Sequence, residues 1–227
     1  MSPQSHGQQL LEALYRRLLA RAHEACADAT IDGMVAMEEL PRRLLMSFTP
    51  AGGQLLLNTT TSSTQQNAAV VVTPSGGSVA VWAGNSGADG NGYGVYGQRF
   101  DSTGARVGGE FLVNQTTTGD QILPRIAVDG SGNFVVTWTD SQSGVTNVYA
   151  RLFNANATPA GSEFVVNSVT TGNQQDSDVA MESGGTFIIA WDGQGPGDIL
   201  GIFAREFQPD GTPVGSQVLI NSTTTNA

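Results

Sequence analysis

From Gln54 onward the sequence repeats itself with a period of about 54 residues. Three markers keep this period: an Asn in a Thr-rich segment, a Trp that follows it at a constant distance, and an aromatic residue in a strand-like run after the Trp. The Asn markers are Asn58, Asn114, Asn167 and Asn221, the Trp markers are Trp82, Trp138 and Trp191, and the aromatic markers are Tyr96, Tyr149 and Phe203. Three markers with one shared spacing indicate tandem copies of one structural unit, which buries its apolar residues against its neighbours.

Each unit contains four runs with the composition of β-strands. In the middle unit these runs are 125–128, 133–138, 147–153 and 163–167. The connections are short and rich in Gly, Asp and Asn, as in 129–132, which suits tight reversals of the chain. Short connections join antiparallel neighbours, so each unit is predicted to form a four-stranded antiparallel sheet.

The strand that ends in the Trp is apolar on both faces in the third unit, where residues 187–191 read Phe-Ile-Ile-Ala-Trp. A strand of this kind is covered on both sides. Stacked four-stranded sheets achieve this in a propeller, whereas a sandwich covers only one face of each sheet. We therefore predict a mainly β domain over 54–227, with three propeller-like blades.

A closed propeller has at least four blades, so three blades predict an incomplete ring. Three arrangements follow. The chain is a fragment of a longer protein, it pairs with a second copy to close six blades, or it forms an open arc whose edge associates with other molecules. The first is favoured, because the repeat pattern breaks off at 221–225, where a further unit would begin.

Residues 1–47 differ from the repeats and predict a helical N-terminal segment. Apolar residues recur there at steps of three and four between about Gln8 and Ala27, with charged residues between them. A Pro- and Gly-containing stretch at 49–53 separates this segment from the repeats.

The net charge of −10 limits the partners that the chain can bind. All ten basic residues are Arg, and an acidic surface repels phosphate backbones and anionic lipid. No apolar run reaches the length of a membrane span. We therefore expect neither nucleic-acid binding nor a transmembrane segment.

Catalytic and metal-binding residues are sparse in the sequence. His6, His23 and Cys26 all precede the repeats, so neither a Ser-His-Asp triad nor a zinc cluster is predicted in the β region, and no cofactor is expected. A propeller glycosidase would use paired carboxylates, for which Asp140 and Asp192, each just after its Trp, are the candidates. The simpler interpretation makes both of them solvated loop residues.

The repeats resemble those of very large bacterial secreted and surface proteins of the adhesin and RTX type. The resemblance rests on Tyr-Gly-Gln-Arg-Phe-Asp at 96–101, Glu-Phe-Leu-Val-Asn at 110–114 and Phe-Val-Val-Thr-Trp at 134–138. A second segment, with Leu40, Pro41, Arg42, Leu44 and Leu45, resembles the LEPR-XLL export motif of such proteins, although the residue order departs from it.

The resemblance implies a non-enzymatic module at the surface of a bacterium or outside the cell, which serves in adhesion or as a structural spacer. Its partners would be other repeats of a longer chain, a second copy, or a glycan or other cell-surface ligand. The calcium-binding nonapeptides of RTX proteins are absent, and the nearest loops, 85–91 and 129–133, offer one carboxylate each. The alternative function is that of a propeller-type carbohydrate-active enzyme or glycan-binding module.

Overall fold

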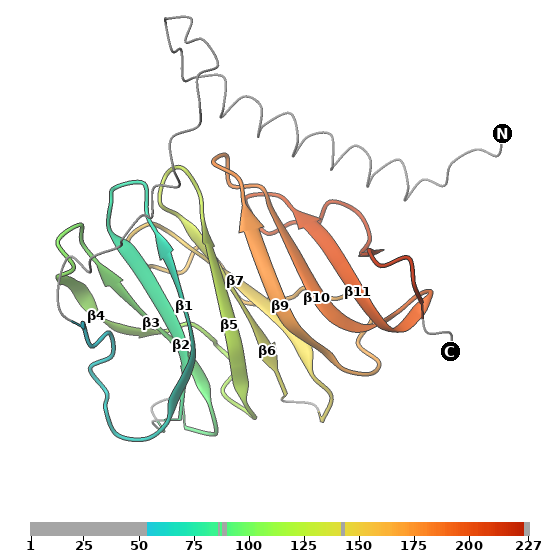
Figure 1. Cartoon of the computed structure of the whole chain (residues 1–227), viewed down its shortest axis with the longest axis horizontal. Coiled ribbons are helices and arrows are strands. Elements are labelled where there is room, and N and C mark those ends of the chain that lie inside the picture. The colour runs from blue at the N-terminus through green and yellow to red at the C-terminus, as the bar shows by residue number, and fades with distance from the viewer. Residues whose placement is uncertain (1–53, 86, 88–89, 142–143, 225–227) are drawn as a thin grey trace, which may run out of the picture. The chain divides into compact units, whose positions relative to one another are not determined.

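The computed structural model describes residues 54–85, 87, 90–141 and 144–224. These residues form three four-stranded antiparallel sheets, each built from four strands that follow one another along the chain (Figure 1). Sheet A contains β1 (Gln65–Val72), β2 (Ser78–Gly84), β3 (Gly94–Phe100) and β4 (Arg106–Leu112). Sheet B contains β5 (Gln121–Val128), β6 (Phe134–Asp140), β7 (Asn147–Phe153) and β8 (Phe164–Val165). Sheet C contains β9 (Gln174–Met181), β10 (Phe187–Gly195), β11 (Asp198–Phe207) and β12 (Val218–Leu219).

The prediction of a mainly β fold with three propeller-like blades is confirmed. The sheets stand side by side, and the first strand of each packs against the first strand of the next, β1 on β5 and β5 on β9. We call β1, β5 and β9 the inner strands.

Two apolar cores lie between the sheets. Between A and B, Val79 and Val81 of β2 meet Phe134, Val136 and Trp138 of β6. Between B and C, Val135 of β6 meets Phe187, Ile189 and Trp191 of β10. Sheet B is therefore covered on both faces, as expected for a strand that is apolar on both sides.

The Trp and aromatic markers are direct cross-strand neighbours in each sheet. Trp82 pairs with Tyr96, Trp138 with Tyr149 and Trp191 with Phe203. The ring centroids lie 6.2 Å apart for Trp138 and Tyr149 and 6.3 Å apart for Trp191 and Phe203. Such contacts add to the burial of apolar area and fix the register of the two central strands.

The last three Asn markers follow the fourth strand of each sheet and bond the end of that strand to the third strand. The Oδ1 atom of Asn167 accepts a hydrogen bond from Val148 N at 2.8 Å, and its Nδ2 atom donates to Val169 O at 2.9 Å and to Asn147 Oδ1 at 2.8 Å. Asn221 makes the corresponding three bonds in sheet C, to Ile202 N, Asp198 Oδ2 and Thr223 O. Asn114 accepts from Val95 N and donates to Thr116 O in the same way, but its third bond goes to Gln121 Oε1 at the start of sheet B. Only an amide offers an acceptor and two donors at one site, which explains why Asn recurs here.

A polar clamp ties each unit to the end of the unit before it. Both carboxylate oxygens of Glu163 accept bonds from Gln115 N and Thr116, at 2.5–3.0 Å. Glu110 binds Thr59 and Thr60 in the same way, and Gln217 binds Ser168 at 2.8 Å. The residue that makes this clamp is Glu110 in sheet A, Glu163 in sheet B and Gln217 in sheet C.

The first strand of the middle unit begins earlier than predicted, at Gln121 rather than Arg125. Pro124 and a shift of register between Ile122 and Arg125 disguise this part of the strand in the sequence. The last strand is shorter than predicted, because the Asn167 side chain replaces ladder bonds at its end.

Several sequence-based predictions lie outside the described residues. These are the helical segment over 1–47, Cys26, and the export segment with Leu40, Pro41, Arg42, Leu44 and Leu45. Within the part of the chain that the structure describes, no helix has the length and apolar character needed to cross a membrane.

Candidate active site at the inner-strand bulges

The three inner strands share a backbone irregularity at the same position. Asn67, Leu123 and Asp176 have φ values of 55°, 55° and 51°, and each is the third residue of its strand. The ladder register shifts around each of them, so each forms a β-bulge. A non-glycine residue in the left-handed region is uncommon and costs of order 1–3 kcal/mol, and such residues cluster at functional sites.

Hydrogen bonds to sheet B hold the bulge of β9 in place. The backbone N–H of Asp176 donates to Thr139 Oγ1 at 3.2 Å, and the Ser177 and Thr137 hydroxyls are 2.9 Å apart. Ser177, Thr137 and Thr139 are buried, so these bonds lie out of water. The bulge therefore presents the Asp176 side chain from a fixed backbone.

A second carboxylate lies next to the Asp176 bulge. Asp192 belongs to β10 and pairs in register with Gln175 of β9, the residue that precedes Asp176. The Asp192 side chain is exposed, yet its partial desolvation by the neighbouring strands, and then the negative charge of Asp176, raise the pKa of its carboxyl above the ordinary value. A carboxyl with a raised pKa beside another carboxylate has the properties of a general acid.

The structure does not bring the two carboxylates suggested by the sequence together. Asp140 lies two residues after Trp138, whereas Asp192 lies one residue after Trp191, so they sit on opposite faces of their strands. Asp140 is only 1% exposed and has partners within the fold. Burial and the charges of Asp140 and Glu163 raise the pKa of the Tyr149 hydroxyl. Asp140 is therefore an internal structural residue.

Asp176 was missed in the sequence because nothing marks it as a partner of Asp192. In sheet C, Asp192 occupies the position that Thr139 has in sheet B and Ala83 has in sheet A. Among these three positions, a carboxylate next to the bulge is thus particular to sheet C. The only available signal was an acidic cluster in β9, where Asp176 and Asp178 stand two residues apart.

The side chains of Arg151 and Arg205 have a structural role, because they donate hydrogen bonds to backbone carbonyl oxygens. Arg151 donates to Val113 O at 2.8 Å and to Gly161 O at 3.1 Å, and Arg205 donates to Val166 O and Gly215 O. Each guanidinium also lies near an aromatic ring, 5.5 Å from Phe153 for Arg151. The bonds to Val113 O and Val166 O connect each arginine to the end of the preceding unit.

The Asp129 loop is a turn stabilised by its own carboxylate. Asp129 Oδ1 accepts from Ser131 N and Asn133 N, each at 2.8 Å, and Oδ2 accepts from Asn133 Nδ2 at 2.9 Å. Among the residues that the structure describes, no group of three or more His, Cys, Asp or Glu is placed to hold a metal ion.

The comparisons with known proteins give a fold and no family. No family model matches the chain, and no curated protein matches it. The chain is similar to the crystal structure of an α-L-arabinofuranosidase from Lactobacillus brevis, with 15% identity, a TM-score of 0.50 and coverage of 70% of this chain and 58% of that one. The fold is of the propeller type. The chain spans less than two thirds of the length of that enzyme.

Two further solved structures are similar at lower scores. One is an N-acetylgalactosamine deacetylase from F. plautii, with 16% identity, a TM-score of 0.48 and coverage of 74% of this chain and 57% of that one. The other is a GH43 endo-arabinanase from Bacillus licheniformis, with 16% identity, a TM-score of 0.41 and coverage of 70% and 60%.

The likeness to the arabinofuranosidase structure contradicts the resemblance to RTX-type and LEPR-XLL surface proteins. With it, the expected non-enzymatic role in adhesion or as a spacer, and the expectation that the chain is not an enzyme, are wrong. The physical reason lies in the residues on which the resemblance rested. Asn114 is bonded to β3 of sheet A and Trp138 is buried in β6 of sheet B, so the motifs that contain them report the fold and carry no information on ligand or activity.

Proposed function

We propose that the chain is part of a propeller-type carbohydrate-active enzyme that cleaves glycosidic bonds at the bulge of β9. Asp192 is the general acid that protonates the leaving oxygen, and Asp176 supplies the second carboxylate. The observation that carries the proposal is the position of Asp192 on β10 beside the bulge that holds Asp176 on β9, where the charge of Asp176 helps to raise the pKa of Asp192. The likeness of the fold to an arabinofuranosidase supports it.

The proposed chemistry needs two carboxyl groups with different roles. A general acid must hold its proton near the working pH, and partial desolvation together with the like charge of Asp176 shifts the pKa of Asp192 upward, in that direction. The second carboxylate either attacks the sugar or activates a water molecule, and the separation of the two groups decides between these routes. The bulge fixes Asp176 for this task because its backbone N–H is bonded to Thr139.

Hydrolysis of a panel of chromogenic glycosides, which includes α-L-arabinofuranosides and β-mannosides, tests the proposal. We expect Asp192→Asn and Asp176→Asn each to lower kcat by about 10²–10⁴-fold. Asp178→Asn is the matched control, since Asp178 is an exposed carboxylate of the same strand, and it should keep its activity. Absence of turnover on the whole panel, or full activity of Asp192→Asn, would refute the proposal.

Association with further repeats or with a second copy stays a prediction. Apolar side chains of sheet C at Leu200 and Ile202 are 76% and 38% exposed, which supports contact with another sheet. Light scattering on the purified chain measures its mass and tests this point. The location outside the cell or on its surface also stays a prediction, which cell fractionation tests.

A further inference from the structure

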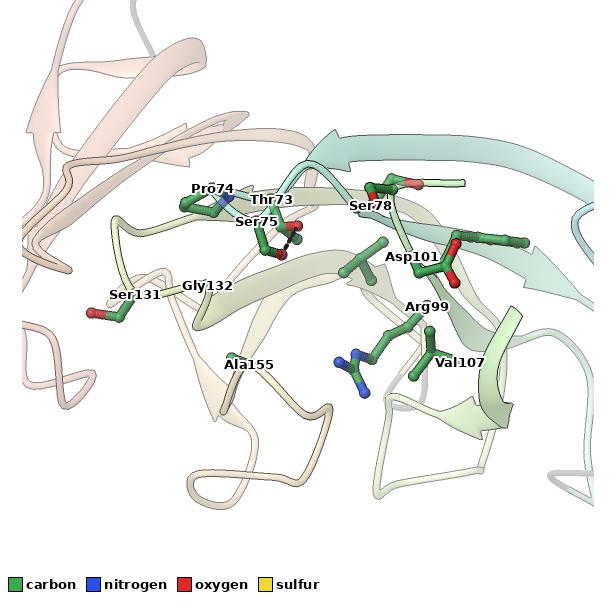
Figure 2. Close-up of a pocket in the computed structure, with 14 residues that line it drawn as sticks. Thr73, Pro74, Ser75, Ser78, Arg99, Asp101, Val107, Ser131, Gly132 and Ala155 are labelled. Carbon is green, nitrogen blue, oxygen red and sulfur yellow. Dashed lines mark hydrogen bonds between the residues drawn. The ribbon is translucent and has the colours of Figure 1, made fainter. Parts of the chain in front are cut away.

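A pocket of about 440 Å³ lies between sheets A and B, at the end of the inner strands opposite to the bulges, and it is lined by both polar side chains and the apolar side chains of Val79, Phe100 and Val107. It is formed where the β1–β2, β3–β4 and β5–β6 turns come together. Figure 2 shows Arg99, Asp101 and Val107 on one side of the pocket and Ser131, Gly132 and Ala155 on the other, with Thr73 and Ser75 between them. A pocket of this size suits a small-molecule ligand.

The corresponding place between sheets B and C is largely filled. There the pocket measures about 130 Å³, and Phe134, Leu152 and Pro209 line it. The residues at the matching positions of the larger pocket are Ser78, Arg99 and Ala155. Two large apolar side chains and a Pro are thus replaced by two polar side chains and an Ala. The space between A and B is a feature of that one interface and does not follow from the repeat.

The charged side chains of the pocket are one cation and one anion. Arg99 is anchored by a bond from Nη1 to Asn156 O at 3.3 Å, which leaves its other N–H groups directed at the pocket. Asp101 Oδ1 accepts bonds from Thr103 and Ala105, and these bonds hold the pKa of the Asp101 carboxyl below its ordinary value. Asp101 therefore stays charged, and the bonds of its own turn fall on Oδ1.

Hydroxyl groups make up most of the remaining polar lining. Thr73 and Ser75 are hydrogen-bonded to each other at 3.0 Å, and Ser78 and Ser131 line the same space. Because the charges of Arg99 and Asp101 balance, the lining favours a neutral ligand over a phosphate or another strong anion. Adjacent hydroxyl groups of a sugar can donate to Asp101 and accept from Arg99.

We propose that this pocket binds one or two residues of a neutral glycan without cleaving it. Among the described residues that line the pocket, Asp101 is the one carboxylate, whereas hydrolysis needs a pair. The proposal extends the proposed function, from which it takes the ligand class. It adds a carbohydrate contact separate from Asp176 and Asp192.

Titration of the ¹⁵N-labelled chain with sugars, followed by NMR, tests the pocket. The probes are arabinobiose, mannobiose and N-acetyllactosamine, with digalacturonate as the anionic comparison. We expect at least one neutral disaccharide to bind with a Kd of about 1 mM or lower and to shift the amide signals of Gly77 and Gly132. Arg99→Leu and Ser78→Phe, which install the residues found in sheet B, should each weaken binding by at least about tenfold.

Glu206→Leu is the matched control, because Glu206 holds the position of Arg99 in sheet C and lies away from the pocket. It should leave the affinity unchanged, and thermal unfolding verifies that all variants fold. No shift with any neutral sugar, equal affinity of Arg99→Leu and the natural chain, or tighter binding of digalacturonate would overturn the proposal. Asp192→Asn should retain sugar binding here while losing hydrolysis, so failure of the pocket and failure of the active site give different results.

Discussion

Replacing Asn167 with Ala is expected to destabilise the β domain by about 3 kcal/mol. The Asn167 side chain is 3% exposed and makes three hydrogen bonds, to Val148 N, Asn147 Oδ1 and Val169 O, at 2.8, 2.8 and 2.9 Å. Each bond contributes about 1 kcal/mol net, and alanine leaves all three partners without it inside the fold. For a chain of this size, a loss of about 3 kcal/mol lowers Tm by roughly 6–12 °C.

The matched control for Asn167→Ala is Asn221→Ala. Asn221 makes the corresponding bonds to Ile202 N, Asp198 Oδ2 and Thr223 O, but at the more exposed end of sheet C. Water can replace the lost partners there, so we expect a loss of only about 1 kcal/mol. Urea unfolding followed by tryptophan fluorescence measures both values. A loss below about 1 kcal/mol for Asn167→Ala, or equal losses for the two variants, would refute the reasoning.

Two further predictions concern pH and the tryptophans. Because the folded-state pKa of Asp192 is raised, the carboxyl destabilises the fold as pH rises through that pKa. Asp192→Asn should therefore be more stable than the natural chain at neutral pH and equal to it in acid; urea midpoints at pH 3 and pH 7 that show the opposite order would contradict this. Trp191 Nε1 donates to Gln174 Oε1 at 2.9 Å, whereas Trp138 Nε1 has no hydrogen-bond partner among the described residues. Trp191→Phe should thus cost about 1 kcal/mol more than Trp138→Phe in thermal unfolding, and equal costs would speak against it.

The repeats and the sheet order could be predicted from the sequence because they depend on local patterns. The spacing of the Trp markers and the apolar strands around them are direct consequences of burial on both faces of sheet B. Short Gly-rich turns then leave antiparallel pairing as the simplest connection. These features need no knowledge of contacts between distant residues.

The candidate site could not be predicted, because it depends on backbone geometry and on pairs across strands. Asn67 and Asp176 belong to the residue types that tolerate a positive φ best, but Asn and Asp are common throughout the repeats, and Leu123 at the equivalent position gives no such signal. The proximity of Asp176 to Asp192 follows from the register of β9 on β10 with its bulge. The most conspicuous motifs misled the functional prediction, since their residues are used to hold sheets together.

The clamp between successive units is of the same kind at each junction, so the number of units can change without a change in these contacts. Glu163 accepts hydrogen bonds from Gln115 and Thr116, and Gln217 accepts one from the matching Ser168. Each of these units therefore binds the end of the preceding unit by the same kind of contact. Removal of 114–166 would join Val113 to Asn167. Ser168 would then follow sheet A directly and could still donate its hydrogen bond to Gln217 of sheet C. A chain with one blade fewer or one blade more would therefore keep the same clamp contacts at each junction between units.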